Sequence, residues 1–471
     1  MSRSRKNAME GAMRLKLLGN YWNPTFVLLW TVESAAVLCA SRIAPHVLAP
    51  YSAASGWAQS WVFVVMVLSA MMSMGLFNHR FRDRMAGIVL RISISVLAGG
   101  MLAVLVFTLW PGPRVPVSEI VTAAVISWLF LVLVRMAARN AIDESPFRRR
   151  VLVLGGGHNA ALILNLRRRA EQRGFKLVGF VPAEGEDLQV PSERVVRVGE
   201  SMRDYAVAEH IGEIVVAVED RRRNFPLRAL LECRLAGIEI VDLASFLERE
   251  TGRVYLEILS PSWLIFGGGC RNDALRRSLE RLFDFIASGV FLCLVGPVML
   301  LTALAIKLED GFRAPVFYFQ DRVGFQGRIV RLCKFRSMRT DAESDGRAHW
   351  ASSHDERVTK VGSLIRKVRI DELPQLFNVF KGQMSFVGPR PERPEFVAQL
   401  AQSIPYYEDR HAVKPGITGW AQLCYPYGCC ERDALEKLQY DLYYVKHHGL
   451  TLDLLILLQT VEVIVLGRGS R

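Results

Sequence analysis

The chain has 471 residues, enough for two or three domains, with 51% hydrophobic residues and a formal net charge of +13 at pH 7. A soluble globular enzyme rarely combines these properties, whereas apolar spans with basic surfaces are typical of proteins that meet an anionic membrane or phosphorylated substrates. Nucleic acid could also explain the charge, but the long apolar runs between the basic residues favour membrane lipid and argue against a nucleic-acid partner.

Residues 1–140 hold four apolar stretches long enough to cross a bilayer, which takes about 20 residues. They run over 24–43, 57–77, 86–110 and 117–136. Lysine and arginine gather before the first stretch, between the second and third, and after the fourth. Because positively charged loops stay in the cytoplasm, the pattern predicts a four-helix transmembrane anchor with both flanking segments cytoplasmic. Glu33 and Arg91 interrupt the apolar pattern, and we expect them to face other helices or a membrane edge.

A soluble pattern begins at residue 146. Strand-like runs at 151–154, 176–181, 213–218 and 238–243 alternate with helical stretches, which predicts a parallel sheet over 146–265. Gly155, Gly157 and Ala160 satisfy the dinucleotide fingerprint G-x-G-x-x-A, but Pro182 stands about where a ribose-binding acid is expected. A tight strand-to-helix turn also needs glycine, so we favour a Rossmann-like domain without a bound cofactor.

A fifth apolar segment, 282–306, carries arginine or lysine on both sides and contains Gly296 and Pro297 in its middle. By the charge rule both of its ends face the cytoplasm, which a simple crossing does not allow. Proline removes a helix hydrogen bond and bends the helix. The sequence therefore predicts a re-entrant membrane hairpin, and a kinked helix that crosses fully is the alternative.

The stretch from 334 to 391 surrounds two adjacent carboxylates, Asp371 and Glu372, with cations. The cations are Lys334, Arg336, Arg366, Lys367, Arg369, Lys381 and Arg390. Arginine binds phosphate oxygens through a planar fork and lysine as a point charge. Mg²⁺ binds carboxylate and phosphate oxygens together. The pattern predicts a site for phosphate and a divalent metal.

A structural role for the same carboxylates is also consistent with the sequence. Leucine and phenylalanine recur at helical spacing from Leu373 to Phe380, and Pro374 is tolerated only in a first turn. Asp371 could therefore be a helix N-cap, with Glu372 favoured by the helix dipole. A helix N-terminus also attracts phosphate, so the residues alone leave the catalytic and the cap-only interpretations open.

The remaining C-terminal part offers weaker signals. Residues 414–420 form a turn-rich loop whose Trp420 could line a pocket or belong to the core. Residues 440–466 are amphipathic and aromatic-rimmed, which predicts helices at the membrane interface. The eight cysteines form no C-x-x-C pair, which argues against zinc and structural disulfides.

From about residue 276 to its end, the chain resembles the bacterial sugar transferases, which are monotopic polyprenyl-phosphate phosphoglycosyl transferases. Four segments carry the resemblance in the same order: QDRVGFQGRIVRLCKFRSM (320–338), RIDELPQLFNVFKGQMSFVGPRPE (369–392), VKPGITGWAQL (413–423) and YDLYYVKHHGLTLDLLILLQTV (440–461). The family's membrane-dipping helix is usually broken by Ser-Pro, where this chain has Gly296-Pro297. The resemblance implies a membrane α plus α/β fold, with a C-terminal α-rich catalytic domain over 276–471.

The same resemblance implies an activity. A sugar-1-phosphate would pass from a UDP-sugar, with glucose favoured, to undecaprenyl phosphate at the cytoplasmic face of the bacterial inner membrane. UMP would be released, in the first membrane step of exopolysaccharide or O-antigen synthesis. Asp371 would be the nucleophile of a phospho-aspartyl sugar intermediate, and Glu372 would hold Mg²⁺. Lys334, Arg366 and Arg390 match phosphate-binding positions, and we add Arg336 because it shares the KFRSM motif.

Two other classes of function compete with this one. The first is a nicotinamide-dependent membrane enzyme that works through 155–160, and the missing ribose-binding acid argues against it. The second is a non-catalytic scaffold for polysaccharide assembly, and the intact KFRSM, DE and GPRP motifs argue against it. The sequence does not identify the sugar, the pathway, a ligand of the Rossmann-like domain or the oligomeric state, a homo-oligomer included.

Overall fold

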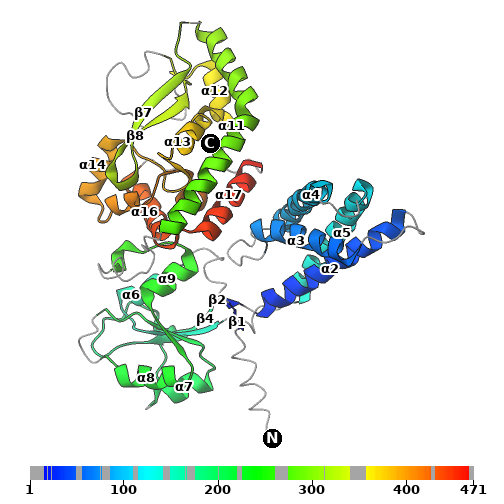
Figure 1. Cartoon of the computed structure of the whole chain (residues 1–471). Helices are drawn as coiled ribbons and strands as arrows, with labels where there is room; N and C mark the ends of the chain where they lie inside the picture. Colours follow the sequence, from blue (N-terminus) through cyan, green and yellow to red (C-terminus); the bar gives the residue numbers. More distant parts are fainter. Residues whose placement is uncertain are drawn as a thin grey trace. The chain divides into compact units, whose positions relative to one another are not determined.

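The computed structural model of the chain divides into two compact units, Met1–Thr251 and Gly252–Arg471 (Figure 1). The structure describes residues 15–17, 20–22, 24–48, 56–74, 76, 85–109, 115–141, 149–164, 166, 175–199, 201–219, 225–259, 274–311, 313–339, 357–425 and 430–465. Most of the basic residues that support the predicted topology, such as those at 3–14 and 80–84, lie outside these ranges. The boundaries between the predicted anchor and the Rossmann-like domain stay predictions.

Four helices form the first part of unit 1: α2 (Pro24–Leu48), α3 (Trp57–Ser73), α4 (Met85–Leu109) and α5 (Val117–Ala141). They share a core of aliphatic side chains that includes Val37, Val67, Ile92 and Leu131. By length and composition, Gly87–Leu109 and Val117–Ala138 could each cross a membrane, while the apolar part of α3 spans only Trp57–Met72. Apolar helices of the membrane type are thus confirmed, whereas four crossings are not.

Glu33 faces a neighbouring helix, as predicted. Its carboxylate is fully buried and pairs with Arg135 of α5, with 2.5 Å between Nε and Oε1. Arg135 also donates to the carbonyl of Leu76 at 3.0 Å. A charged group inside an apolar helix is costly unless it is paired within the bundle, so this pair explains how α2 tolerates an acid.

A four-stranded sheet forms the second part of unit 1. Its order is β4 (Phe175–Val181), β3 (Arg149–Leu154), β5 (Glu213–Val216), β6 (Glu239–Asp242), and every neighbouring pair is parallel. The helices of this part are α6 (His158–Leu164), α7 (Met202–Ala208), α8 (Leu227–Leu235) and α9 (Leu243–Thr251). The predicted parallel sheet of alternating strands and helices is confirmed.

The turn after β3 requires glycine for a physical reason. Gly155 has a φ of +127°, and a Cβ there would lie 2.9 Å from the backbone carbon of Ala217. A side chain at this position would therefore be strained in its dihedrals and would also clash with β5's continuation. This close approach explains the glycine at position 155 without any ligand.

Unit 2 is built from helices around two small sheets. The antiparallel pair β7 (Phe317–Val323) and β8 (Ile329–Phe335) carries the KFRSM motif at its end, and β9 (Ser385–Val387) pairs in parallel with β10 (Gly416–Thr418). The helices are α11 (Ala274–Asp310), α12 (Lys360–Lys367), η5 (Ile370–Glu372), α13 (Gln375–Phe380), α14 (Pro394–Ser403), η6 (Glu408–Ala412), α15 (Trp420–Cys424), α16 (Glu431–His447) and α17 (Leu450–Val465).

Residues 252–259 pack with unit 2, although the predicted Rossmann-like domain extended to 265. Val254 shares a buried cluster with Leu438 and Leu442 of α16. The indole of Trp420 donates to the carbonyl of Gly252 at 2.8 Å and is 3% exposed, so this tryptophan belongs to the core and does not line a pocket. Buried Tyr440 shows that one face of α16 packs inside the unit, and the predicted interfacial position of that helix stays a prediction.

The apolar segment predicted as a hairpin is one helix, α11, which stays helical through Gly296 and Pro297. The reversal is therefore not confirmed: a proline inside a helix can bend it without ending it. Figure 1 shows α11 running beside α12 and α13, and contacts with both are present. One stripe of its residues is buried from end to end: Asp284, Ser288, Met299, Thr302 and Ile306.

Candidate active site

Asp371 and Glu372 lie in the short turn η5, between α12 and α13. Thr359 caps the start of α12 by accepting from the Gly362 amide at 2.9 Å. The chain then leaves α12 through Arg369, whose φ of +59° is in the left-handed region. Few residues other than glycine adopt this conformation, and it turns the backbone into η5 directly before the carboxylates.

The cap-only interpretation of Asp371 is wrong. The residue that precedes α13 is Pro374, and no side chain caps that helix. Instead, Asp371 Oδ1 is buried and has no hydrogen-bond partner among the residues that the structure describes. A buried polar oxygen without a partner is costly, which makes it a candidate for contact with a substrate or a metal.

Glu372 is held by cations from two separate motifs. Its Oε1 accepts from Arg390 Nη2 at 2.8 Å and from Lys334 Nζ at 3.4 Å. Arg369 Nη1 lies 3.9 Å from the same oxygen. Burial acts to raise the pKa of Glu372, but Arg390 and Lys334 outweigh burial and hold this pKa well below its ordinary value. Glu372 is therefore a permanent anion of the site.

Asp371 differs from its neighbour. Burial, followed by the negative charge of Glu372, raises the pKa of Asp371, while Lys334, Arg369 and Arg366 oppose that rise. Two adjacent carboxylates whose environments separate their pKa values can take different chemical roles. Glu372 organises the cations, and Asp371 is left with an oxygen available for reaction.

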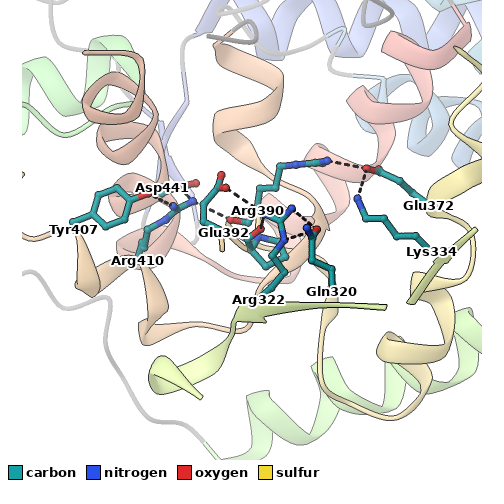
Figure 2. A network of polar contacts seen from close by, with 10 residues as sticks. Gln320, Arg322, Lys334, Glu372, Arg390, Glu392, Tyr407, Arg410 and Asp441 are labelled. Atoms are coloured by element: carbon teal, nitrogen blue, oxygen red, sulfur yellow. Dashed lines mark hydrogen bonds and ion pairs between the residues drawn. The ribbon is translucent and has the colours of Figure 1, made fainter. Parts of the chain in front are cut away.

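The structure brings together most of the residues predicted for this site. Lys334 at the end of β8 and Arg390 after β9 meet at Glu372, as Figure 2 shows. The positive charge of Arg366, in the last turn of α12, acts to lower the pKa of Asp371. Among the described residues, no acid forms an ion pair with the Arg366 guanidinium. These three cations and the two carboxylates form one polar cluster built from four segments of the chain.

Arg336 lies in a different environment from the other predicted phosphate-binding residues. It is 7% exposed, and its Nη2 pairs with Asp310 Oδ2 at 2.7 Å, at the end of α11. Its backbone amide donates to the carbonyl of Val316 at 2.9 Å. This arrangement shows a structural contact between β8 and α11, and phosphate binding by Arg336 stays a prediction.

The sequence interpretation missed a set of buried and half-buried polar residues behind Arg390. They are Gln320, Arg322, Glu392, Tyr407, Arg410 and Asp441, and Figure 2 shows them next to Arg390. Each lies in or beside a quoted motif, but their charges come from segments that are distant in sequence. No spacing rule predicts such a pairing, because only the tertiary fold brings the segments together.

A metal predicted at Glu372 fits these residues only if the substrate supplies other ligands. Among the described residues, no three side chains of histidine, cysteine, aspartate or glutamate converge on a point. Mg²⁺ is often held by one or two carboxylates together with substrate phosphates and water. The adjacent Asp371 and Glu372, with the unpartnered Asp371 Oδ1, suit that arrangement and do not form an all-protein cage.

The glycine turn of the part predicted to be Rossmann-like was the other candidate site. The Gly156 amide donates to Glu186 Oε2 and the His158 amide donates to Glu219 Oε1, both at 2.7 Å. A Cβ on Gly157 would lie 2.8 Å from the Glu219 carboxylate. Dinucleotide-binding domains offer the amides of this turn to pyrophosphate. Here two carboxylates of the domain itself occupy them, which supports a domain without dinucleotide.

Comparison with known proteins agrees with the site. A family model described as bacterial sugar transferase matches residues 275–467. The chain is 43% identical over 244 residues to the Aeromonas hydrophila UDP-N-acetylgalactosamine-undecaprenyl-phosphate N-acetylgalactosaminephosphotransferase, a match covering 52% of this chain and 56% of that protein. It is 33% identical over 336 residues to the Komagataeibacter xylinus undecaprenyl-phosphate glucose phosphotransferase, covering 68% of this chain and 60% of that protein.

The chain thus spans little more than half the length of these two curated relatives. A third relative is an uncharacterised sugar transferase of Bacillus subtilis, 40% identical over 198 residues. That match covers 41% of this chain and 89% of the relative, so this chain contains a segment similar to nearly the whole of that relative. With the polar cluster at Asp371 and Glu372 and these matches, the chain belongs to the bacterial sugar transferase family.

Proposed function

We propose that the protein is an undecaprenyl-phosphate sugar phosphotransferase. It transfers a sugar-1-phosphate from a UDP-sugar to undecaprenyl phosphate, releases UMP and so initiates a repeat unit of exopolysaccharide or O-antigen. The names of two relatives describe reactions of this class. The observation that supports the proposal best is the buried oxygen of Asp371, which has no partner among the described residues and lies beside a cluster of cations.

The reaction proceeds in two displacements at one phosphorus atom. A carboxylate oxygen of Asp371 attacks the β-phosphorus, which carries the sugar. The new O–P bond forms as the bond from this phosphorus to the bridging oxygen breaks, and UMP leaves with the electron pair. An oxygen of the lipid phosphate then attacks the same phosphorus and releases the Asp371 carboxylate. An ionised carboxylate needs no general base for the first step.

The cations of the cluster bind the diphosphate. Lys334 and Arg390 form ion pairs with Glu372, and the positive charge of Arg366 acts on Asp371. The planar fork of arginine suits phosphate oxygens, and a fixed array of cations stabilises charge that develops on the leaving group. Glu372 is the residue that would hold Mg²⁺, which when bound neutralises charge on the diphosphate.

The contacts of the α11 helix support our proposal that this reaction occurs at a membrane surface. Near its start, Asp284 accepts from the Ser385 hydroxyl at 3.1 Å and the Phe386 amide at 3.3 Å. Near its end, Glu309 accepts from the Lys360 and Val361 amides at 2.8 and 3.0 Å. One folded unit therefore holds both ends of α11. A helix that crossed the bilayer would separate its ends by about 30 Å of hydrocarbon.

The opposite side of α11 is apolar and exposed, with Ile286, Leu294, Leu300 and Leu301 among its residues. Contiguous exposed apolar surface of this kind marks contact with membrane or protein. In our proposal α11 lies in one leaflet with both of its ends at the cytoplasmic face of the inner membrane, so the site opens where a soluble UDP-sugar meets a lipid phosphate.

The proposed donor is UDP-glucose, in line with the relative that matches 68% of this chain and is named for glucose. The test is turnover of the purified protein with undecaprenyl phosphate and UDP-glucose, UDP-galactose, UDP-N-acetylglucosamine or UDP-N-acetylgalactosamine. We expect UMP with UDP-glucose and lipid-linked sugar in equal amount. Activity with another sugar alone would contradict the donor assignment, and absence of UMP with all four would contradict the reaction.

A further inference from the structure

The segment that carries Arg390 lacks the usual backbone donors. Arg390 stands between Pro389 and Pro391, neither of which has an N–H group. Four successive carbonyls of the segment nevertheless each accept a hydrogen bond. Pro389 accepts from the Gly416 amide at 3.0 Å and Glu392 from the Val323 amide at 2.9 Å. The two central carbonyls are bound by side chains.

Those two side chains are arginines from other elements. Arg410 of η6 donates from Nη2 to the Arg390 carbonyl at 3.1 Å. Arg322 of β7 donates from Nη1 to the Pro391 carbonyl at 3.2 Å. Two guanidinium groups therefore fix the backbone carbonyls of Arg390 and Pro391. Unlike a water molecule, a guanidinium group points each of its N–H donors in a set direction.

Arg410 is itself held in place by buried partners. Its Nη2 pairs with Asp441 Oδ2 of α16 at 2.7 Å, and its Nη1 donates to the Tyr407 hydroxyl at 2.8 Å. Arg410 is 5% exposed and Asp441 is 2% exposed. Figure 2 shows this pair on one side of Arg390 and the Glu372–Lys334 pair on the other.

A buried ion pair is weak evidence for a contribution to stability, because an apolar pair of similar volume is often as stable. The geometry here points to another use. The two hydrogens of Arg410 Nη2 face different partners, the Asp441 carboxylate and the Arg390 carbonyl. An apolar pair could not hold that carbonyl, and a lysine could not direct donors to these partners and to Tyr407 with the same fixed fork.

We propose that the Arg410–Asp441 pair is a positioning device for Arg390, which fixes the backbone of Arg390 so that its guanidinium stays on Glu372 and faces the substrate diphosphate. Neither Arg410 nor Asp441 touches the substrate; both act through Arg390. This inference rests on the proposed function, since it assigns Arg390 to the diphosphate.

The test is a double-mutant cycle on the full chain, measured as initial rate of UMP release. Asp441→Asn in the wild-type background should lower the rate about 100-fold, a loss expected when a catalytic group is misplaced by about 1 Å. In an Arg390→Ala background the same substitution should change the residual rate by less than about threefold, because residues that act through a shared group are not additive. A merely structural role predicts the same loss in both backgrounds.

Two further variants keep the test informative if Asp441→Asn fails to fold. Arg410→Lys keeps the charge but not the fork, and Tyr407→Phe removes one acceptor while keeping the ring. Both should show the same dependence on Arg390, with the smaller loss for Tyr407→Phe. The matched control is Glu436→Gln, on the same helix as Asp441. It breaks the ion pair between Glu436 Oε2 and Arg253 Nη1, which are 2.5 Å apart, and it should leave the rate of UMP release unchanged.

The outcomes separate the two proposals. If the wild type releases no UMP from any UDP-sugar, the proposed function fails. If the wild type is active and the losses for Asp441→Asn, Arg410→Lys and Tyr407→Phe are equal with and without Arg390, the positioning role is refuted while the reaction stands.

Discussion

At the scale of single residues, the raised pKa of Asp371 has a consequence for activity. Burial and the charge of Glu372 raise this pKa above the ordinary value of 3.8. The attacking carboxylate must be ionised, so kcat/KM for the UDP-sugar is maintained above the pKa of Asp371 and falls as pH drops through it. We expect the acid limb of the pH profile to lie above pH 3.8. An acid limb at or below the ordinary value, in protein shown to stay folded, would argue against this role.

Glu372→Gln tests the second carboxylate. The substitution keeps size and removes the charge that both Arg390 and Lys334 contact. We expect a loss of about 10–100-fold in apparent Mg²⁺ affinity, the range for disturbed metal sites, with partial recovery of rate at high Mg²⁺. A titration of rate against Mg²⁺ measures this. A rate that is low at every Mg²⁺ concentration would place Glu372 in another role.

The residue-level chemistry could be predicted from sequence only in part. Asp371 and Glu372 are adjacent in the chain, and Lys334 and Arg390 lie in recognisable motifs, so their meeting was predictable. Arg336 belongs to the same motif as Lys334, yet the fold pairs it with Asp310. Arg410 and Asp441 were not predictable, because a buried charge is recognised by its partner and the partner comes from a distant segment.

At the scale of elements, the glycine turn after β3 gives a prediction for the Rossmann-like part. Glu186 and Glu219 accept from the amides that a pyrophosphate would need. Calorimetry on the full chain should therefore show no NAD or NADP binding tighter than about 100 µM, which corresponds to about 5.5 kcal/mol. Binding at micromolar concentration would restore the nicotinamide-dependent alternative. A Glu186→Gln, Glu219→Gln variant is the comparison that shows whether the carboxylates set this limit.

The topology of α11 is the second element-level prediction. In a background that lacks the eight native cysteines, exposed positions that flank the apolar segment 282–306, Ser278→Cys and Arg313→Cys, should both react with a membrane-impermeant maleimide only after the cells are opened. The reason is that both ends of α11 bind the same folded unit. Labelling of either position from outside intact cells would show that the helix crosses.

The hydrophobic periodicity of the sequence predicted which helices and strands exist more accurately than it predicted where a helix bends. The alternating strands and helices of 146–265 predicted a parallel sheet, and the structure contains one, of order β4-β3-β5-β6. The same reasoning expected a reversal at Pro297, but a helix with packing along its whole length can keep its course through a proline. The buried stripe from Asp284 to Ile306 supplies that packing, and sequence periodicity alone does not say which surface lies against it.

At the scale of the whole molecule, the charge and hydrophobicity of the chain agree with a membrane enzyme that acts on phosphorylated compounds. The chain's net charge is +13, and three of its basic residues, Lys334, Arg366 and Arg390, surround one pair of carboxylates. The apolar content lies in helices such as α4, α5 and α11, each long enough to enter a bilayer. What composition could not supply is the arrangement of the two units.

The central claim is that Asp371 attacks phosphorus and forms a covalent intermediate. The most direct measurement is incubation of the purified protein with a UDP-sugar labelled in the β-phosphate, without lipid acceptor, followed by denaturation and mapping of bound label. We predict label on the peptide that contains Asp371 and release of UMP in equal amount, with neither in Asp371→Asn, which keeps the fold because Asp371 caps no helix. Release of UDP, or label and turnover unchanged in Asp371→Asn, would contradict the mechanism.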